Sequence, residues 1–232
     1  MKLIPSLMVV ASLGMWLAGQ PLMAQVAPNA TEISQYTGLQ AAAHHGDGVR
    51  LQTLASAPAA ALEARDGRSR TAVHIATFAR QRAAIRILAK AGAKLELLDN
   101  DRYDPVTIAA VANDPETLMV LLSLGASAKL VTSVYDGTAL IAAAHLGHAE
   151  IVRLLIAAGA PLDHVNNLHW TAVIEAIVLG NGGPAHQQTL SALLSAGANT
   201  QLTDRNGATP LQLARARGFK EMVVLLEKAG AR

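Results

Sequence analysis

Apolar residues return along this chain at helical spacing, in short stretches that each end at a Gly-Ala pair. In the stretch Glu150–Ala158, for example, Ile151, Leu154 and Leu155 share one helical face. Glycine readily adopts the left-handed conformation that ends a helix, so each pair predicts a helix end. The pairs begin 33, 34, 38 and 33 residues apart, at Gly92, Gly125, Gly159, Gly197 and Gly230.

A second phrase, Thr-Ala-Val-His or a variant of it, keeps step with the first. It begins 21 residues before the glycine, except in one copy at 26. A Thr or Asp at its start can accept a hydrogen bond from the first turn of a helix. Each period therefore predicts two short helices, and because one pair cannot bury its apolar face alone, the periods must stack. The copies begin at Thr71, Asp104, Thr138, Thr171 and Thr209.

The 33-residue period, the Thr-Pro-Leu-His-like phrase and the Leu-Leu-x-x-Gly-Ala phrase together resemble the ankyrin repeat. The resemblance covers about Tyr36 to Arg232 and is plainest in the stretch DGTALIAAAHLGHAEIVRLLIAAGAPLD. It implies an all-α solenoid of helix-turn-helix units joined by β-hairpin-like loops. We assign residues 33–232 to this domain, with a degenerate capping unit first, and divide it into Ile33–Arg65, Asp66–Leu98, Asp99–Thr132, Ser133–Val165, Asn166–Thr203 and Asp204–Arg232.

Some units depart from the pattern at the turn between their two helices. Arg80 stands where the helix-ending glycine is expected, which predicts a strained or reshaped turn. In the next unit Asn113-Asp114-Pro115 replaces the Gly-His pair, with Asn suited to a left-handed turn, Asp to capping and Pro to the first helical position. Five extra residues fall around Gly180–Pro184, and we expect them to protrude as a small finger.

The first 24 residues have the pattern of a secretory signal peptide. Lys2 precedes an apolar run from Leu3 to Ala18, and a small residue, Ala24, precedes Gln25. We expect cleavage after Ala24, a short linker at residues 25–32 and a periplasmic location, with secretion from the cell as the alternative. No later segment is long and apolar enough to cross a membrane, so we expect no integral membrane segment in the mature chain.

The chain offers no pattern of residues for catalysis. It has no cysteine, which excludes disulfides and thiolate metal sites, and its serines lack the Gly-x-Ser-x-Gly context. The glycines at 180–183 lack the Lys-Ser/Thr that grips phosphate. A net charge of +2, with no basic run interleaved with aromatics, argues against a nucleic-acid partner. We therefore expect no enzyme activity and no cofactor.

The histidines support one alternative hypothesis, a metal- or haem-binding protein that uses His145, His148 and His169. The first two could share a helix face, but Gly147 is expected to end the helix between them. No further ligands stand at a recognisable spacing, so a structural role is favoured and no metal site is assigned. The resemblance implies that His74 links adjacent units.

The resemblance implies that a ligand lies along a concave groove formed by the first helices and the loop tips. Large aromatics at such a surface are frequent anchors of protein interfaces. Four of the six aromatic residues of the mature chain fall at these positions. Carried over residue by residue, the partner-binding positions are Arg68, Arg70, Phe78, Tyr103, Val111, Tyr135, His145, Leu146, His169, Trp170, Glu175, Leu179 and Arg217.

The leading hypothesis is therefore a non-catalytic, monomeric module that binds a partner protein in the cell envelope through the concave groove. An alternative with the same fold is a dedicated inhibitor or protector of one periplasmic enzyme, such as a toxin or an oxidative-defence enzyme. The sequence does not name the partner.

Overall fold

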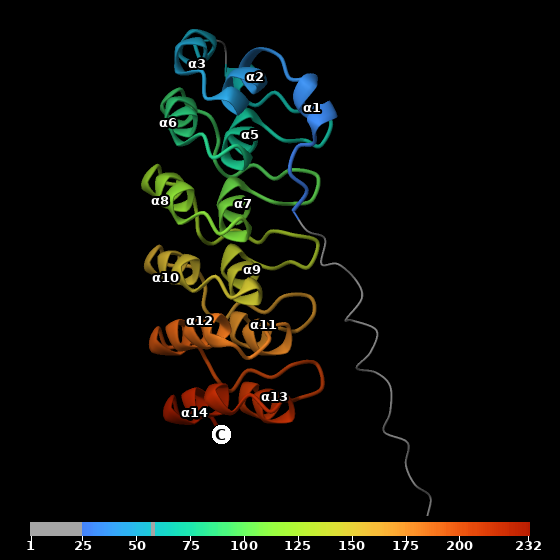
Figure 1. Ribbon diagram of the computed structural model, residues 1–232, viewed down its shortest axis with the longest axis vertical. Helices are drawn as coiled ribbons and strands as arrows, with labels where there is room; N and C mark the ends of the chain where they lie inside the picture. The colour runs from blue at the N-terminus through green and yellow to red at the C-terminus, as the bar shows by residue number, and fades with distance from the viewer. Residues whose placement is uncertain (1–24, 57–58) are drawn as a thin grey trace, which may run out of the picture.

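The computed structural model describes residues 25–56 and 59–232, and the predicted signal peptide lies outside these ranges. The described residues form an elongated stack with two layers of helices (Figure 1). This architecture confirms the predicted all-α solenoid of helix pairs. The first layer holds α5 (Ala72–Phe78), α7 (Pro105–Val111), α9 (Ala139–Leu146), α11 (Ala172–Val178) and α13 (Pro210–Ala216).

The second layer packs beside the first, on the side away from the loops, and completes each pair (Figure 1). It holds α6 (Arg82–Lys90), α8 (Pro115–Ser123), α10 (Ala149–Ala157), α12 (Pro184–Ser195) and α14 (Lys220–Lys228). The N-terminal end of the stack is closed by α1 (Ala30–Ser34), α2 (Gly38–His45), α3 (Gly48–Leu54) and α4 (Ala59–Leu62). Long loops between successive pairs project from the first layer, and one of them carries an isolated antiparallel bridge between Thr132 and Gly137.

The helix ends follow the local chemistry of the sequence. The Thr138 hydroxyl accepts a hydrogen bond from the Ile141 amide, 3.3 Å away, and so caps α9. Gly147 ends the same helix with a φ of 72°, in the left-handed region. At the start of α8 the Asp114 carboxylate accepts from the Thr117 amide, and Asn113 takes a φ of 49°. The predicted reason for the Asn-Asp-Pro substitution is thus confirmed.

Arg80 also adopts the left-handed conformation that its place in the repeat requires. Its φ is 55°, and its guanidinium lies 3.5 Å from Asp114 of the next unit. Because a side chain with a Cβ is less favourable than glycine at such a φ, the turn is strained as the sequence predicts.

The core lies between the two layers and is continuous along the stack. Leu118, Leu121, Ile151 and Leu155 from the second-layer helices have no exposed surface, and burying each such side chain contributes about 1.5–3 kcal/mol. Small buried alanines in the first layer let neighbouring helices approach closely: Ala76, Ala109, Ala110, Ala143, Ala144 and Ala176.

Histidines link successive units. Nε2 of His74 donates to the carbonyl of Tyr103 in the next unit, 3.2 Å away, while Nδ1 accepts from the Thr71 amide. Burial lowers the pKa of His74 to about 4, so the ring is neutral at pH 7. Nδ1 of His148 likewise donates to the carbonyl of Ala110 in the preceding unit, at 3.0 Å. The predicted structural role of His74 is confirmed.

The five extra residues of the fifth unit do not form a protruding finger, which corrects the expectation from sequence. α12 has 12 residues where α10 has 9, so part of the insertion lengthens this helix. Its added first turn places His186 against the preceding unit, where Nε2 donates to the carbonyl of His145, 2.9 Å away. A Cβ on Gly180 would lie 2.0 Å from the carbonyl oxygen of Ala176, so the insertion needs glycine there.

Across the part of the chain that the structure describes, no helix has the length and apolar character needed to span a membrane.

Candidate binding site in the concave groove

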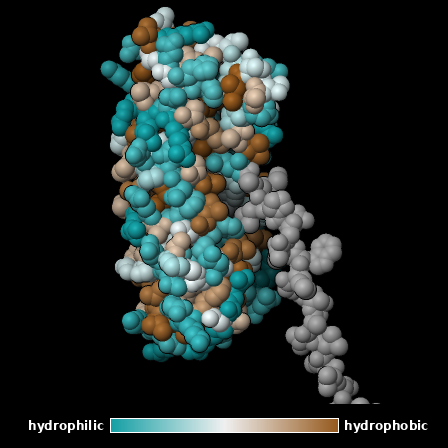
Figure 2. Space-filling model, viewed as in Figure 1, coloured by the Kyte–Doolittle hydropathy of each residue, from teal (hydrophilic) through white to brown (hydrophobic). Residues whose placement is uncertain are grey.

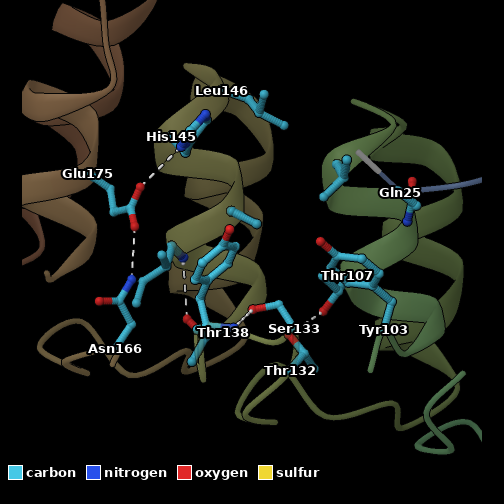
Figure 3. A pocket seen from close by; sticks show the side chains of 15 residues that line it. Gln25, Tyr103, Thr107, Thr132, Ser133, Thr138, His145, Leu146, Asn166 and Glu175 are labelled. Carbon is cyan, nitrogen blue, oxygen red and sulfur yellow. Dashed lines mark hydrogen bonds and ion pairs between the residues drawn. The ribbon is translucent and has the colours of Figure 1, made fainter. Parts of the chain in front are cut away.

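We call the surface formed by the first-layer helices and the loops that precede them the concave groove; Figure 1 shows where these helices and loops lie. A pocket of about 170 Å³ opens in this groove between α7 and α9 (Figure 3). Aromatic and aliphatic side chains form much of its wall, among them Tyr103, Tyr135, Val111, Ile141 and Leu146. On the face seen in Figure 2, hydrophilic side chains separate the apolar ones into small groups along the stack.

The pocket exists because one first-layer residue is small. The fourth residue after the helix cap is Ile75 in α5 and Ile108 in α7, and both are fully buried. In α9 the same position is Ala142, which lines the pocket. A methyl group in place of a branched side chain leaves space against the neighbouring helix.

The wall toward α11 is polar. Glu175, at that same fourth position, is only 4% exposed and its carboxylate accepts from two neighbours. Nδ1 of His145 donates to Oε2 at 3.1 Å, and Nδ2 of Asn166 donates to Oε1 at 2.9 Å (Figure 3). These bonds compensate the carboxylate for burial and hold the His145 ring at the pocket.

The loop tips are shaped by side chains that accept from their own backbone. Asn166 accepts from the amides of Leu168 and Trp170, and Asp99 accepts from those of Asp101 and Tyr103. A polar residue at the start of each loop therefore fixes the tip, which sets where the aromatic residue at its end lies. The Asn166 side chain thus holds the backbone of Trp170, and Trp170 is half-buried.

The described N-terminal residues also reach the groove. From α1 the chain passes along the loops to Gln25, which lines the pocket near α7 (Figure 1, Figure 3). Arg70 anchors this segment. Its guanidinium lies 2.7 Å from Asp66 and 2.8 Å from Glu32, and it donates to the carbonyl of Val26 at 3.4 Å.

The structure gathers about half of the predicted partner-binding residues at one site. Those that line the pocket are Tyr103, Val111, Tyr135, His145, Leu146 and Glu175. The others lie outside it: Arg68, Arg70 and His169 on loops, Phe78 at the end of α5, Trp170 before α11, and Leu179 and Arg217 just after α11 and α13. Arg217 stacks over Phe219, with its guanidinium carbon 5.6 Å from the ring centre.

Two of the predicted contact residues are not surface residues. Arg70 has no exposed area because it is enclosed by Asp66, Glu32 and the N-terminal segment. Its expected position on an open loop tip is therefore wrong. Glu175 is also buried, so it can act on a partner only through the pocket wall.

Sequence reasoning missed several residues of the pocket. Gln25 had been assigned to a linker, and Asn166 to a unit boundary. Thr107 and Thr132, which also line the pocket, share a buried hydrogen bond of 3.1 Å between their hydroxyls. The exchange of a large residue for Ala142 was the available sign of a cavity, and it is visible only when the units are aligned with one another.

The histidines of the metal hypothesis serve other contacts. His145 binds Glu175, His148 binds a backbone carbonyl, and His169 lies exposed on a loop with a φ of 63°. Among residues 25–56 and 59–232, the structure places no three His, Cys, Asp or Glu side chains together as a metal site.

Comparison with known proteins supports this reading of the fold. A family model for ankyrin repeats (three copies) matches residues 106–204. The Escherichia coli (strain K12) ankyrin repeat protein YahD is 36% identical over 167 residues, which make up 72% of this chain and 83% of YahD.

Solved structures give the same result. An ankyrin repeat domain from Acinetobacter baumannii AYE is 44% identical, with a TM-score of 0.78 over 84% of this chain and 98% of that domain. The ankyrin repeat domain of Bcl-3, a member of the IkappaB family, is 26% identical, with a TM-score of 0.76 over 85% of this chain and 88% of that domain. The chain belongs to the ankyrin repeat family, whose repeats are protein–protein interaction modules and generally non-catalytic.

Proposed function

We propose that this protein is a non-catalytic module that captures a partner protein through the pocket between α7 and α9 and the groove around it. The observation that carries the proposal is the pocket itself. Its volume of about 170 Å³ suits one apolar or aromatic side chain, since a cavity of roughly 150 Å³ holds a benzene ring. Two tyrosines at its wall supply the contact area that anchors of protein interfaces use.

We propose further that capture takes place in the cell envelope. The signal-peptide pattern of residues 1–24 supports export to the periplasm, with secretion from the cell as the alternative. The proposed partner is thus a protein of the envelope, and the proposed working form is a monomer.

The test is affinity capture from the envelope fraction with the mature chain as bait. Leu146→Glu places a charge at the pocket mouth, where Leu146 is 40% exposed, so folding should be unaffected. The matched control is Val224→Glu on α14, because Val224 is 47% exposed and does not line the pocket. The partner should be retained by the wild type and by the control, and lost with Leu146→Glu. Equal retention by all three would disprove the site.

A second pair of variants separates the pocket from the neighbouring loop. Tyr103→Ala removes a pocket wall and should weaken capture at least tenfold, because interface anchors contribute roughly 2 kcal/mol or more. Trp170→Ala removes an aromatic that does not line the pocket and should have a smaller effect. A larger loss of capture with Trp170→Ala than with Tyr103→Ala would place the site at the loop before α11 instead. Far-UV circular dichroism of each variant checks that the helices are intact.

A further inference from the structure

The segment Gln25–Asn29 already occupies part of the concave groove. It has no regular secondary structure, and it enters from α1 to place Gln25 at the pocket. Figure 3 shows the Gln25 side chain beside α7, above Tyr103 and Thr107. A partner that fills the pocket and the groove next to it must therefore meet this segment first.

Residues 25–28 make one hydrogen bond to the rest of the described part of the chain. The Val26 carbonyl accepts a single long bond of 3.4 Å from Arg70, while the strong ion contacts of Arg68 and Arg70 are made further along, to Glu32. Val26 is 42% exposed. Gln25 and Val26 can thus leave the groove without breaking the Glu32 cluster that fastens α1.

The fit of Gln25 is also poor chemically. Its side-chain Nε2 is buried and has no hydrogen-bond partner among the described residues. A buried donor without a partner disfavours the state that buries it, by about tenfold to a hundredfold in equilibrium. An apolar side chain in the same place would carry no such cost.

We infer that residues 25–28, the part of this segment before the α1 cap Asn29, are a displaceable occupant of the pocket region, and that the partner replaces them with an extended segment of its own. The inference rests on the proposed function. The partner's segment places an apolar side chain where Gln25 now lies, and a backbone carbonyl within reach of the Arg70 guanidinium. The N-terminal segment thereby selects against ligands that bind the groove too weakly to displace it.

The test measures access to the pocket and needs no partner. Because the chain has no cysteine, Val111→Cys puts a single thiol on the pocket wall, and its reaction rate with 5,5′-dithiobis(2-nitrobenzoate) reports opening. Val224→Cys on α14 gives the rate of an exposed thiol. Each cysteine variant is expressed as residues 25–232 preceded by a single Met. Each is made in three versions, with Gln, Leu or Gly at position 25.

Gln25→Leu removes the unpartnered amide and should slow labelling of the Val111→Cys thiol about tenfold. Gln25→Gly removes the side chain and should speed it toward the Val224→Cys rate, which itself should not change. Equal labelling of Val111→Cys in all three backgrounds would overturn the inference. This result would leave the proposed function standing, since partner capture by the Leu146 variants is measured separately. If capture fails while labelling follows the expected order, the segment gates the pocket and the proposed function is the part that is wrong.

Discussion

Replacing Arg70 by Ala distinguishes a structural role for this residue from a role in partner binding. The guanidinium lies 2.7 Å from Asp66 and 2.8 Å from Glu32, and the side chains of Arg70 and Asp66 are 1% and 7% exposed. Hydrogen bonds from the backbone of Arg70 and Arg68, and the Arg70 charge, hold the pKa of Asp66 below its usual value even though burial opposes this. Removing Arg70 leaves a buried carboxylate without its counter-charge.

The expected loss is about 3 kcal/mol, the lower end of the 3–5 kcal/mol seen when one partner of a buried ion pair is removed. The lower end applies because the Glu32 side chain is 23% exposed and regains water. Arg68→Ala is the matched control, since Arg68 also pairs with Glu32 but its side chain is 39% exposed. Exposed pairs contribute about 0–1 kcal/mol, so this variant should stay close to the wild type.

Urea unfolding followed by circular dichroism at 222 nm compares the three proteins. Because a stack of repeats can open from one end, amide hydrogen exchange in α2 and α5 adds a local measurement at the N-terminal end. Arg70→Ala should lower stability and protection there, while Arg68→Ala should not. Equal stability of the two variants would refute the reasoning, because the buried contacts of Arg70 would then contribute no more than the exposed contacts of Arg68.

Three further changes test the fold. Burial lowers the folded-state pKa of His74 to about 4, below its usual 6.5. The stability that His74 contributes is therefore complete above pH 6.5, and about 3 kcal/mol of it is lost as the pH falls toward 4. Thermal melts across this pH range should show the loss in the wild type, and His74→Ala should lack that part of the pH dependence. Gly180→Ala would bring a Cβ to 2.0 Å from the Ala176 carbonyl oxygen and should lower the free energy of unfolding in urea by about 3 kcal/mol. Gly67→Ala is the control, because a Cβ added there meets no atom within 4 Å, and it should change the free energy of unfolding by less than about 0.5 kcal/mol. Leu155→Ala, in the core between layers, should cost about 2–5 kcal/mol by the same assay, and a smaller loss would mean that the layers repack around it.

The candidate site was predicted in part. Tyr103, Val111, Tyr135, His145 and Leu146 line the pocket as their places in the repeat imply. Their shared location could be predicted because each unit repeats the same backbone, so a position in one unit marks the same place in the next; their role in partner binding stays a prediction. The repeat pattern could not predict the pocket, because the pocket depends on the side chains that face each other across neighbouring units.

The sequence by itself determined the helix pairs, their period and their ends. These features rest on interactions within a few residues, such as the Thr138 cap, the left-handed Gly147 and the Asn113 turn. Short-range chemistry of this kind can be read directly from the order of residues, and its repetition made the family recognisable.

Only the tertiary structure decided which polar residues are buried and where the groove is open. Arg70 is enclosed because Glu32, 38 positions earlier in the sequence, returns to it, and Glu175 is enclosed because His145 comes from the preceding unit. The pocket forms where Ala142 faces α7 and where Gln25 arrives from the N-terminal end. Burial depends on which distant segments meet in space, and the residues of one segment do not specify that meeting.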